Sequence, residues 1–227
     1  MSTKAQTIKA VCYDIDGTMI DSEPLHVAAW HETLRLNGRN FADLPPEFQH
    51  TMAGRKPIAI ATFMVENLGV GISPEEFLEQ KHANFMNKVR TDLRPMPGVV
   101  ESVHRLRREF LLGIGTALGQ EYAQLVLRVL GVTDCFEANA IVTGDEIAKG
   151  KPYPETYQTL ALRLGVAPNE MVVLEDASSG IVSAKDAGSW CIAVENTEAA
   201  PQDVSRADVV VHSLDEVTSE LVRSVIK

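Results

Sequence analysis

The sequence has few features of secreted or membrane-bound proteins. It contains three cysteines, which lie far apart and form no CxxC pair, so we expect packed, reduced thiols and no disulfides. Nowhere do about 18 apolar residues follow one another, as a membrane span requires. The first residues, MSTKAQTIKA, lack the apolar stretch of a secretory signal. We therefore expect a cytoplasmic protein that does not bind membranes.

Positive charge is also scarce. Aspartate and glutamate number 31 against 21 lysines and arginines, a net charge of −10, and no basic run is present. The long-range field would repel a nucleic-acid backbone, so we exclude nucleic acid as a partner. No segment has low complexity, and the 45% hydrophobic content is typical of a folded protein. The 227 residues suffice for one large domain, or for a core with a smaller insert.

Short apolar runs alternate with amphipathic stretches along most of the chain. The runs predict strands at 8–15, 110–116, 138–143, 170–175, 189–194 and 207–212. The stretches predict helices at 98–109, 119–130, 153–164, 178–187 and 214–225. Several runs are apolar without alternation, as in strands that are covered on both faces. This order predicts an α/β protein with a parallel sheet wrapped by helices.

Residues 22–94 interrupt the alternation. They contain no convincing strand, and their apolar spacing predicts helices at 23–37, 56–68 and 74–91, separated by glycines and prolines. We therefore predict a core domain formed by 1–21 and 95–227, with an inserted helical domain at 22–94.

Two aspartates lie at the carboxyl end of the first predicted strand, in the stretch CYDIDGT. Residues two apart on an extended chain point the same way, so Asp14 and Asp16 are expected to face one site while Ile15 turns into the core. Ligands of open parallel sheets bind beyond the carboxyl ends of the strands, where this pair lies. The alternative is a simple strand end, with Asp16 capping the turn that begins at Gly17.

Polar residues stand at or beyond the ends of three further predicted strands. They are Thr116, Lys151 within GKPYP, and the adjacent acids Glu175 and Asp176. Each also has a purely structural interpretation: an N-cap for Thr116 and Asp176, and a solvated loop residue for Lys151.

Together, the four strand ends indicate phosphate chemistry. Clustered carboxylates repel one another, and their hard oxygens suit Mg²⁺, which is usually held by a few carboxylates, water and a substrate phosphate. A lysine and a hydroxyl would hold the remaining phosphate oxygens. The metal and Lys151 would reverse the sign of the local field, so an acidic protein can still bind an anion.

The ordered set DIDGT, Thr116, GKPYP and EDASSG resembles the haloacid dehalogenase superfamily, in the branch of β-phosphoglucomutases and sugar-phosphate phosphatases. The similarity spans nearly the whole chain, including a helical insert after the first motif. The resemblance implies a doubly wound, Rossmann-like core with a mobile α-helical cap.

The resemblance also implies roles for the motif residues. Asp14 is expected to be the nucleophile that forms an aspartyl-phosphate, and Asp16 to protonate the leaving alkoxide and then to activate water. Thr116, the Ala117 amide and Lys151 are expected to bind the phosphoryl oxygens, and Lys151 also to restrain Asp14.

The same resemblance implies a magnesium site. Asp14, Glu175, Asp176 and the backbone carbonyl of Asp16 are its expected ligands. A phosphoric monoester hydrolase acting on a small phosphorylated metabolite, most simply a sugar or polyol phosphate, is the function that follows.

Two features depart from the pattern or leave an alternative. Leu118 follows Thr116 and Ala117 where polar residues often stand, which leaves substrate contact at this point open.

Thr18 in DGT favours a phosphatase, whereas His26 lies where related mutases carry a cap-hinge histidine. A β-phosphoglucomutase-like mutase therefore remains an alternative, as does a non-enzymatic signalling module that stores phosphate on Asp14, against which the long insert argues. His26 also has a structural interpretation, as a helix-face residue.

The cap is expected to set substrate specificity by excluding water and gripping the leaving group. Gly54, Arg55 and Lys56 lie in the segment 52–60 that we expect to face the substrate, although a solvated helix start would explain the two cations equally well. For the assembly, we expect a monomer or a weak dimer.

Overall fold

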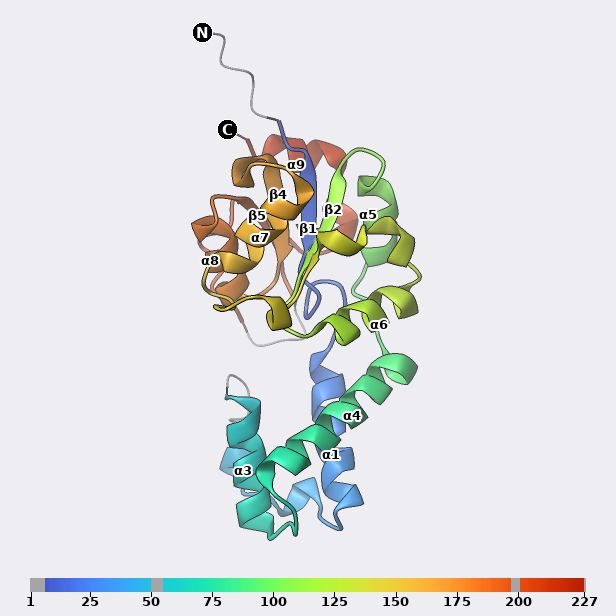
Figure 1. The fold of residues 1–227 in the computed structure, drawn as a ribbon, viewed down its shortest axis with the longest axis vertical. Coiled ribbons are helices and arrows are strands. Elements are labelled where there is room, and N and C mark those ends of the chain that lie inside the picture. Colours follow the sequence, from blue (N-terminus) through green and yellow to red (C-terminus); the bar gives the residue numbers. More distant parts are fainter. Residues whose placement is uncertain (1–6, 50–54, 197–200, 227) are drawn as a thin grey trace. The chain divides into compact units, whose positions relative to one another are not determined.

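The computed structural model describes residues 7–49, 55–196 and 201–226 (Figure 1). The chain divides into two compact units. One comprises Met1–Asp21 and Arg94–Lys227, and is called the core unit below. The other comprises Ser22–Leu93, and is called the helical unit. Among the described residues, no helix is long and apolar enough to cross a membrane.

The core unit contains a six-stranded parallel sheet. Its strands are β1 (Ala10–Tyr13), β2 (Leu111–Gly115), β3 (Ile141–Val142), β4 (Met171–Glu175), β5 (Trp190–Val194) and β6 (Val209–Val211). Their order across the sheet is β3-β2-β1-β4-β5-β6, so the chain builds outward in one direction from β1 and in the other from β4. The predicted doubly wound α/β sheet is confirmed.

Helices cover both faces of this sheet (Figure 1). They are α5 (Val99–Leu106), α6 (Gln120–Leu130), α7 (Glu155–Leu164), α8 (Ser178–Asp186) and α9 (Ser219–Ser224). Alternate strand residues serve the two faces. Cys12 packs in one buried cluster with Leu160 of α7 and Ile181 of α8, whereas the Tyr13 hydroxyl is hydrogen-bonded to Ser102 of α5 at 2.9 Å. Because both faces are buried, the strands are apolar without alternation.

The helical unit contains α1 (Glu23–Leu36), α2 (Pro46–Gln49), α3 (Pro57–Leu68) and α4 (Pro74–Asp92). Proline stands in the first turn of α1, α3 and α4, where a missing N–H costs nothing, and the Ser73 hydroxyl caps α4 by accepting from the Glu76 amide at 3.1 Å. Trp30, Leu34 and Phe77 belong to its buried core. The role of this unit as a cap stays a prediction.

Several predicted elements are shorter than expected: β1 has four residues within the predicted run 8–15, and β6 has three within 207–212. The run at 138–143 contains only the two-residue strand β3, because Ala138–Ala140 forms a 3₁₀ turn; β3 is an edge strand that pairs with β2 alone. The stretch at 214–225 is interrupted: Leu214–Glu216 is a 3₁₀ turn, and Thr218 starts α9 anew by accepting from the Leu221 amide at 3.1 Å.

Candidate active site

Strand register brings the predicted site residues of the core unit to one edge. Tyr13, the last residue of β1, pairs with Ile114 of β2 and with Leu174 of β4. By this register Asp14, which follows β1, lies level with Glu175 at the end of β4 and with Gly115 at the end of β2, and Thr116 is the next residue after Gly115. Residues more than 150 positions apart in the sequence meet because all three strands run in the same direction.

Lys151 connects these strand ends from the loop before α7. Its ammonium donates to Oδ1 of Asp14, to Oε1 of Glu175 at 2.5 Å and to the backbone carbonyl of Gly115 at 2.9 Å. The side chains of Lys151 and Asp14 are each 8% exposed and that of Glu175 is 1% exposed. The Tyr157 hydroxyl of α7 donates to the same Glu175 oxygen at 2.5 Å. A buried cation thus compensates two buried carboxylates at the expected site.

Burial and mutual repulsion set the electrostatics of this cluster. Burial, opposed by the Lys151 charge but reinforced by Glu175, Asp16 and Asp176, raises the pKa of Asp14 well above its usual range. Burial and the adjacent Glu175 raise the pKa of Asp176 to about 7. Burial opposes the charge on Lys151, but Asp14 and Glu175 outweigh it and raise the pKa of the ammonium. Additional positive charge is therefore needed to keep all the carboxylates ionised together.

The carboxylates of Asp14, Glu175 and Asp176 form a group that fits a metal ion. Each offers one oxygen, and these oxygens lie within 4.8 Å of one another. An all-oxygen set with high negative charge suits Mg²⁺ better than a soft transition metal. Asp16 does not join this group through its side chain; only its backbone carbonyl was predicted as a ligand.

Two glycines make room for these acids. Gly17 has φ +79°, and a Cβ on it would lie 2.0 Å from Oδ2 of Asp176. A Cβ on Gly180 in α8 would lie 1.9 Å from Oε1 of Glu175. The turn after β1 and the start of α8 can therefore approach the carboxylates only because both positions lack a side chain.

Asp16 is separate from the Lys151 cluster. Its Oδ1 accepts a 2.6 Å hydrogen bond from the hydroxyl of Tyr122 on α6. Its partly exposed side chain contrasts with Ile15, which is fully buried as predicted. Thr18 in the same turn donates to Oδ1 of Asp176 at 3.3 Å, which links the turn to the metal-ligand candidates.

Thr116 lies fully buried at the end of β2, and its Oγ1 accepts from the Leu118 amide at 3.1 Å. The Leu118 carbonyl in turn accepts from the Gly144 amide at 3.0 Å. Leu118 thus contributes its backbone to the turn, and Ala117 is exposed between these two residues. The predicted role of Thr116 and the Ala117 amide in binding an anion stays a prediction.

The residues predicted for substrate choice belong to the helical unit. The His26 ring stacks on Phe85 at a centroid distance of 3.9 Å, and its Nδ1 lies 2.7 Å from the Lys81 ammonium. Burial and the nearby charges of Lys81 and His82 lower the pKa of His26 to about 3. His26 is thus a packed, neutral and partly exposed ring of the helical unit, consistent with its structural interpretation.

Arg55 and Lys56 are exposed before α3. The Arg55 guanidinium carbon lies 5.2 Å from the ring centroid of Phe48, whereas Lys56 occupies the N-cap position of α3. Gly54 lies outside the described residues.

Tyr122 and Tyr157 were not predicted as site residues. Each follows its motif residue, Thr116 or Lys151, by six positions on the next helix. In the sequence they look like ordinary aromatic residues of an amphipathic helix, because only the tertiary structure shows which carboxylate each hydroxyl meets. The distance of six positions from the motif residue was the one signal in the sequence that could have pointed to these tyrosines.

The chain is similar to known proteins over nearly its whole length. A family model described as haloacid dehalogenase-like hydrolase matches residues 8–188. Validoxylamine A 7'-phosphate phosphatase of Streptomyces hygroscopicus subsp. limoneus is 30% identical over 210 residues, covering 92% of this chain and 95% of the relative. Hexitol phosphatase B of Escherichia coli K12 is 30% identical over 223 residues, covering 97% of this chain and 98% of the relative.

The chain is also similar to a mutase and to a protein of known structure. β-Phosphoglucomutase of Bacillus subtilis is 29% identical over 219 residues, covering 94% of this chain and 93% of the relative. A crystal structure from Thermotoga maritima, assigned as a β-phosphoglucomutase, is 27% identical with a TM-score of 0.81, covering 94% of this chain and 98% of the other. The predicted resemblance and the prediction of an enzyme are confirmed: this chain belongs to the haloacid dehalogenase-like hydrolases.

Proposed function

We propose that the protein is a Mg²⁺-dependent phosphatase that hydrolyses a phosphate monoester of a small sugar or polyol through an aspartyl-phosphate. The observation that carries the proposal is the placement of Asp14, buried at the end of β1 with its Oδ1 bound by Lys151. The similarity to phosphatases of phosphorylated carbohydrates and hexitols supports the class of substrate.

In the first step, a carboxylate oxygen of Asp14 attacks the phosphorus atom while the bond from phosphorus to the ester oxygen breaks. The proton on the Asp16 carboxyl passes to the leaving oxygen, so the free alcohol departs. Thr116 and the Ala117 amide would bind the phosphoryl oxygens, while the Lys151 ammonium, which contacts Asp14, would restrain it and offset charge.

In the second step, water attacks the phosphorus of the aspartyl-phosphate and gives its proton to Asp16. The bond from phosphorus to Asp14 breaks, which releases inorganic phosphate and restores both carboxyl groups to their starting states. Mg²⁺, held by Asp14, Glu175 and Asp176, would supply positive charge that offsets the repulsion between the nucleophile and the phosphoryl oxygens.

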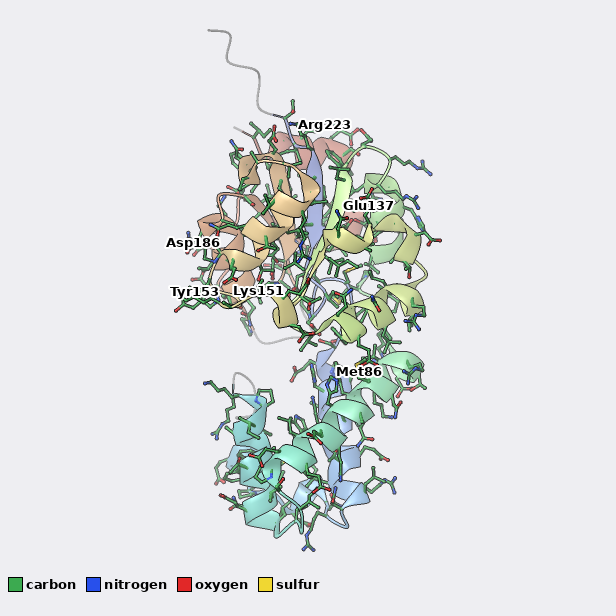
Figure 2. All side chains as sticks on the ribbon, in the orientation of Figure 1. Met86, Glu137, Lys151, Tyr153, Asp186 and Arg223 are labelled. Atoms are coloured by element: carbon green, nitrogen blue, oxygen red, sulfur yellow. The ribbon has the colours of Figure 1, made fainter. Side chains whose placement is uncertain are left out.

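The test is a phosphate-release screen over phosphorylated sugars, polyols and short acids with Mg²⁺. Asp14→Asn should abolish turnover while the circular dichroism spectrum stays unchanged, because the amide is isosteric with the acid but a poor nucleophile. Asp186→Asn is the matched control, since Asp186 forms an exposed ion pair with Arg206 on the core unit (Figure 2). Turnover by a clean Asp14→Asn preparation would exclude Asp14 as the nucleophile.

A mutase is the second candidate, because the relatives include a β-phosphoglucomutase. Such an enzyme would need a sugar bisphosphate as primer and would release little free phosphate. A coupled assay with and without the primer separates the two activities: steady phosphate release that is independent of primer supports the phosphatase.

We further propose that the helical unit contributes to substrate choice, as a cap does. Arg55 is its best candidate contact, because a guanidinium offers a planar set of donors to hydroxyl or phosphate oxygens.

A further inference from the structure

Tyr122 contacts one of the two aspartates of the first motif from a distant part of the sequence. It lies in the first turn of α6, and the residue is 2% exposed. Its hydroxyl donates to Oδ1 of Asp16 at 2.6 Å. A buried phenol without a partner would lose the free energy of its hydration, so this contact accounts for a tyrosine where phenylalanine would pack equally well.

The backbone around Asp16 is fixed by a tight turn. The Gly17 amide donates to the Ile20 carbonyl at 2.8 Å, and the Met19 amide donates to the Ile15 carbonyl at 2.8 Å. These bonds hold the main chain but leave the direction of the Asp16 carboxyl group to side-chain torsions. The Tyr122 hydroxyl supplies a contact that restrains this direction.

The surroundings of Tyr122 make this hydroxyl distinctive. The two residues after Thr116 are Ala117 and Leu118, which bring no polar side chain to the turn. The Thr116 oxygen accepts from the Leu118 amide. The segment from the end of β2 to the first turn of α6 makes one described side-chain hydrogen bond to the first motif. Its donor is Tyr122.

We propose that Tyr122 is a positioning residue for Asp16, holding its carboxyl group in one orientation through the 2.6 Å hydrogen bond to Oδ1. This inference rests on the proposed function, in which Asp16 gives a proton to the leaving alcohol.

The dependence on the leaving group tests this role. Tyr122→Phe keeps the ring and its packing but removes the hydroxyl. The quantity to measure is kcat/KM, which covers the steps up to departure of the alcohol. The probes are the best alkyl phosphate of the phosphate-release screen and 4-nitrophenyl phosphate, whose phenolate leaves without a proton.

We expect kcat/KM of Tyr122→Phe to fall about 10- to 100-fold for the alkyl phosphate, the effect of one hydrogen bond to a charged group. The fall for 4-nitrophenyl phosphate should be less than about 3-fold, because that leaving group does not depend on a positioned acid. An equal fall with both probes, or no fall with the alkyl ester, would overturn the positioning role.

Two other tyrosines provide matched controls. Tyr157→Phe removes a hydroxyl from Glu175 in the metal-ligand group, so it should lower kcat/KM for both probes alike. Tyr153→Phe changes a 55% exposed residue on the same unit and should leave both values unchanged (Figure 2).

The variant Asp14→Asn distinguishes a failure of the proposed function from a failure of the positioning role of Tyr122. If it stays active on either probe, the proposed function fails. If it is inactive on both while Tyr122→Phe shows no preference for the leaving group, only the positioning role fails.

Discussion

The Lys151 ammonium lies 2.5 Å from Oε1 of Glu175, and both side chains are almost completely buried. Lys151 also contacts Asp14, so it is the cation that two buried carboxylates share. Removing one partner of such a pair leaves uncompensated charge inside the protein, which costs far more than the loss of a surface ion pair.

Lys151→Gln should therefore lower the free energy of unfolding by about 3 to 5 kcal/mol and abolish turnover. Added Mg²⁺ should recover part of the stability, because the ion replaces the missing positive charge. Urea denaturation with and without Mg²⁺ measures both effects. In the control Lys185→Gln, whose ammonium pairs with Asp208 at 2.6 Å in a more exposed site, the loss should be about 1 kcal/mol and independent of Mg²⁺.

Gly180→Ala should damage the same site through shape alone. A Cβ would lie 1.9 Å from Oε1 of Glu175, so the carboxylate must move. We expect a loss of about 1 to 3 kcal/mol in unfolding free energy and a higher Mg²⁺ concentration for half-maximal activity. Gly71→Ala is the control, because a Cβ there meets no atom within 4 Å. A wild-type magnesium titration in the Gly180 variant would contradict the tight fit.

Chelation should stop the reaction, and Mg²⁺ should restore it. Because an ion that binds only the folded state stabilises it, Mg²⁺ at 100 times its dissociation constant should add about 2.7 kcal/mol to the unfolding free energy. The shift in Tm should disappear in Asp176→Asn, which loses one candidate ligand, and persist in Asp186→Asn. Equal shifts in both variants would place the ion elsewhere.

His26 should make the protein sensitive to acid. Its folded pKa is about 3, mainly because it is buried, whereas the unfolded value is about 6.5. Below pH 6.5 the unfolded chain binds a proton that the folded chain does not, so stability that is complete above this pH is lost as the pH falls toward 3.

The measurement is the unfolding free energy of wild type and of His26→Gln at each pH. Below pH 6.5 the wild type should lose up to about 1.4 kcal/mol per pH unit relative to this variant. His104→Gln, at an exposed position, should follow the wild-type curve. Parallel curves for wild type and His26→Gln would show that His26 is not buried in its neutral form.

Arg55→Gln should change substrate preference more than the response to Mg²⁺. Arg55 is exposed and lies near Phe48, and its donors suit hydroxyl or phosphate oxygens. We expect the ratio of kcat/KM between two sugar phosphates to change about 10-fold, the effect of one hydrogen bond, with an unchanged magnesium titration. Arg35→Gln is the control, since Arg35 pairs with Glu32 on the surface of α1. An unaltered substrate profile would move the specificity contact to another residue.

Much of the fold was predictable because apolar strands and amphipathic helices leave different periodicities. The edge strand β3 and the interrupted helix at 214–225 were not, since pairing on one side and the second cap at Thr218 depend on neighbours rather than on periodicity. The motif residues Asp14, Lys151 and Glu175 could be identified because each lies at or beyond the end of an apolar strand. Their shared ion pair could not, because it depends on a register between distant strands.

The sequence alone determined the α/β alternation, the helical insert and the chemistry at each strand end, since these depend on local residue order. Only the tertiary structure decided which oxygen each hydroxyl and ammonium would meet. Tyr122 lies 106 positions from Asp16, and their contact exists because α6 and the turn after β1 meet at the same edge of the sheet. Local patterns encode the elements, whereas the contacts between them follow from how these elements pack.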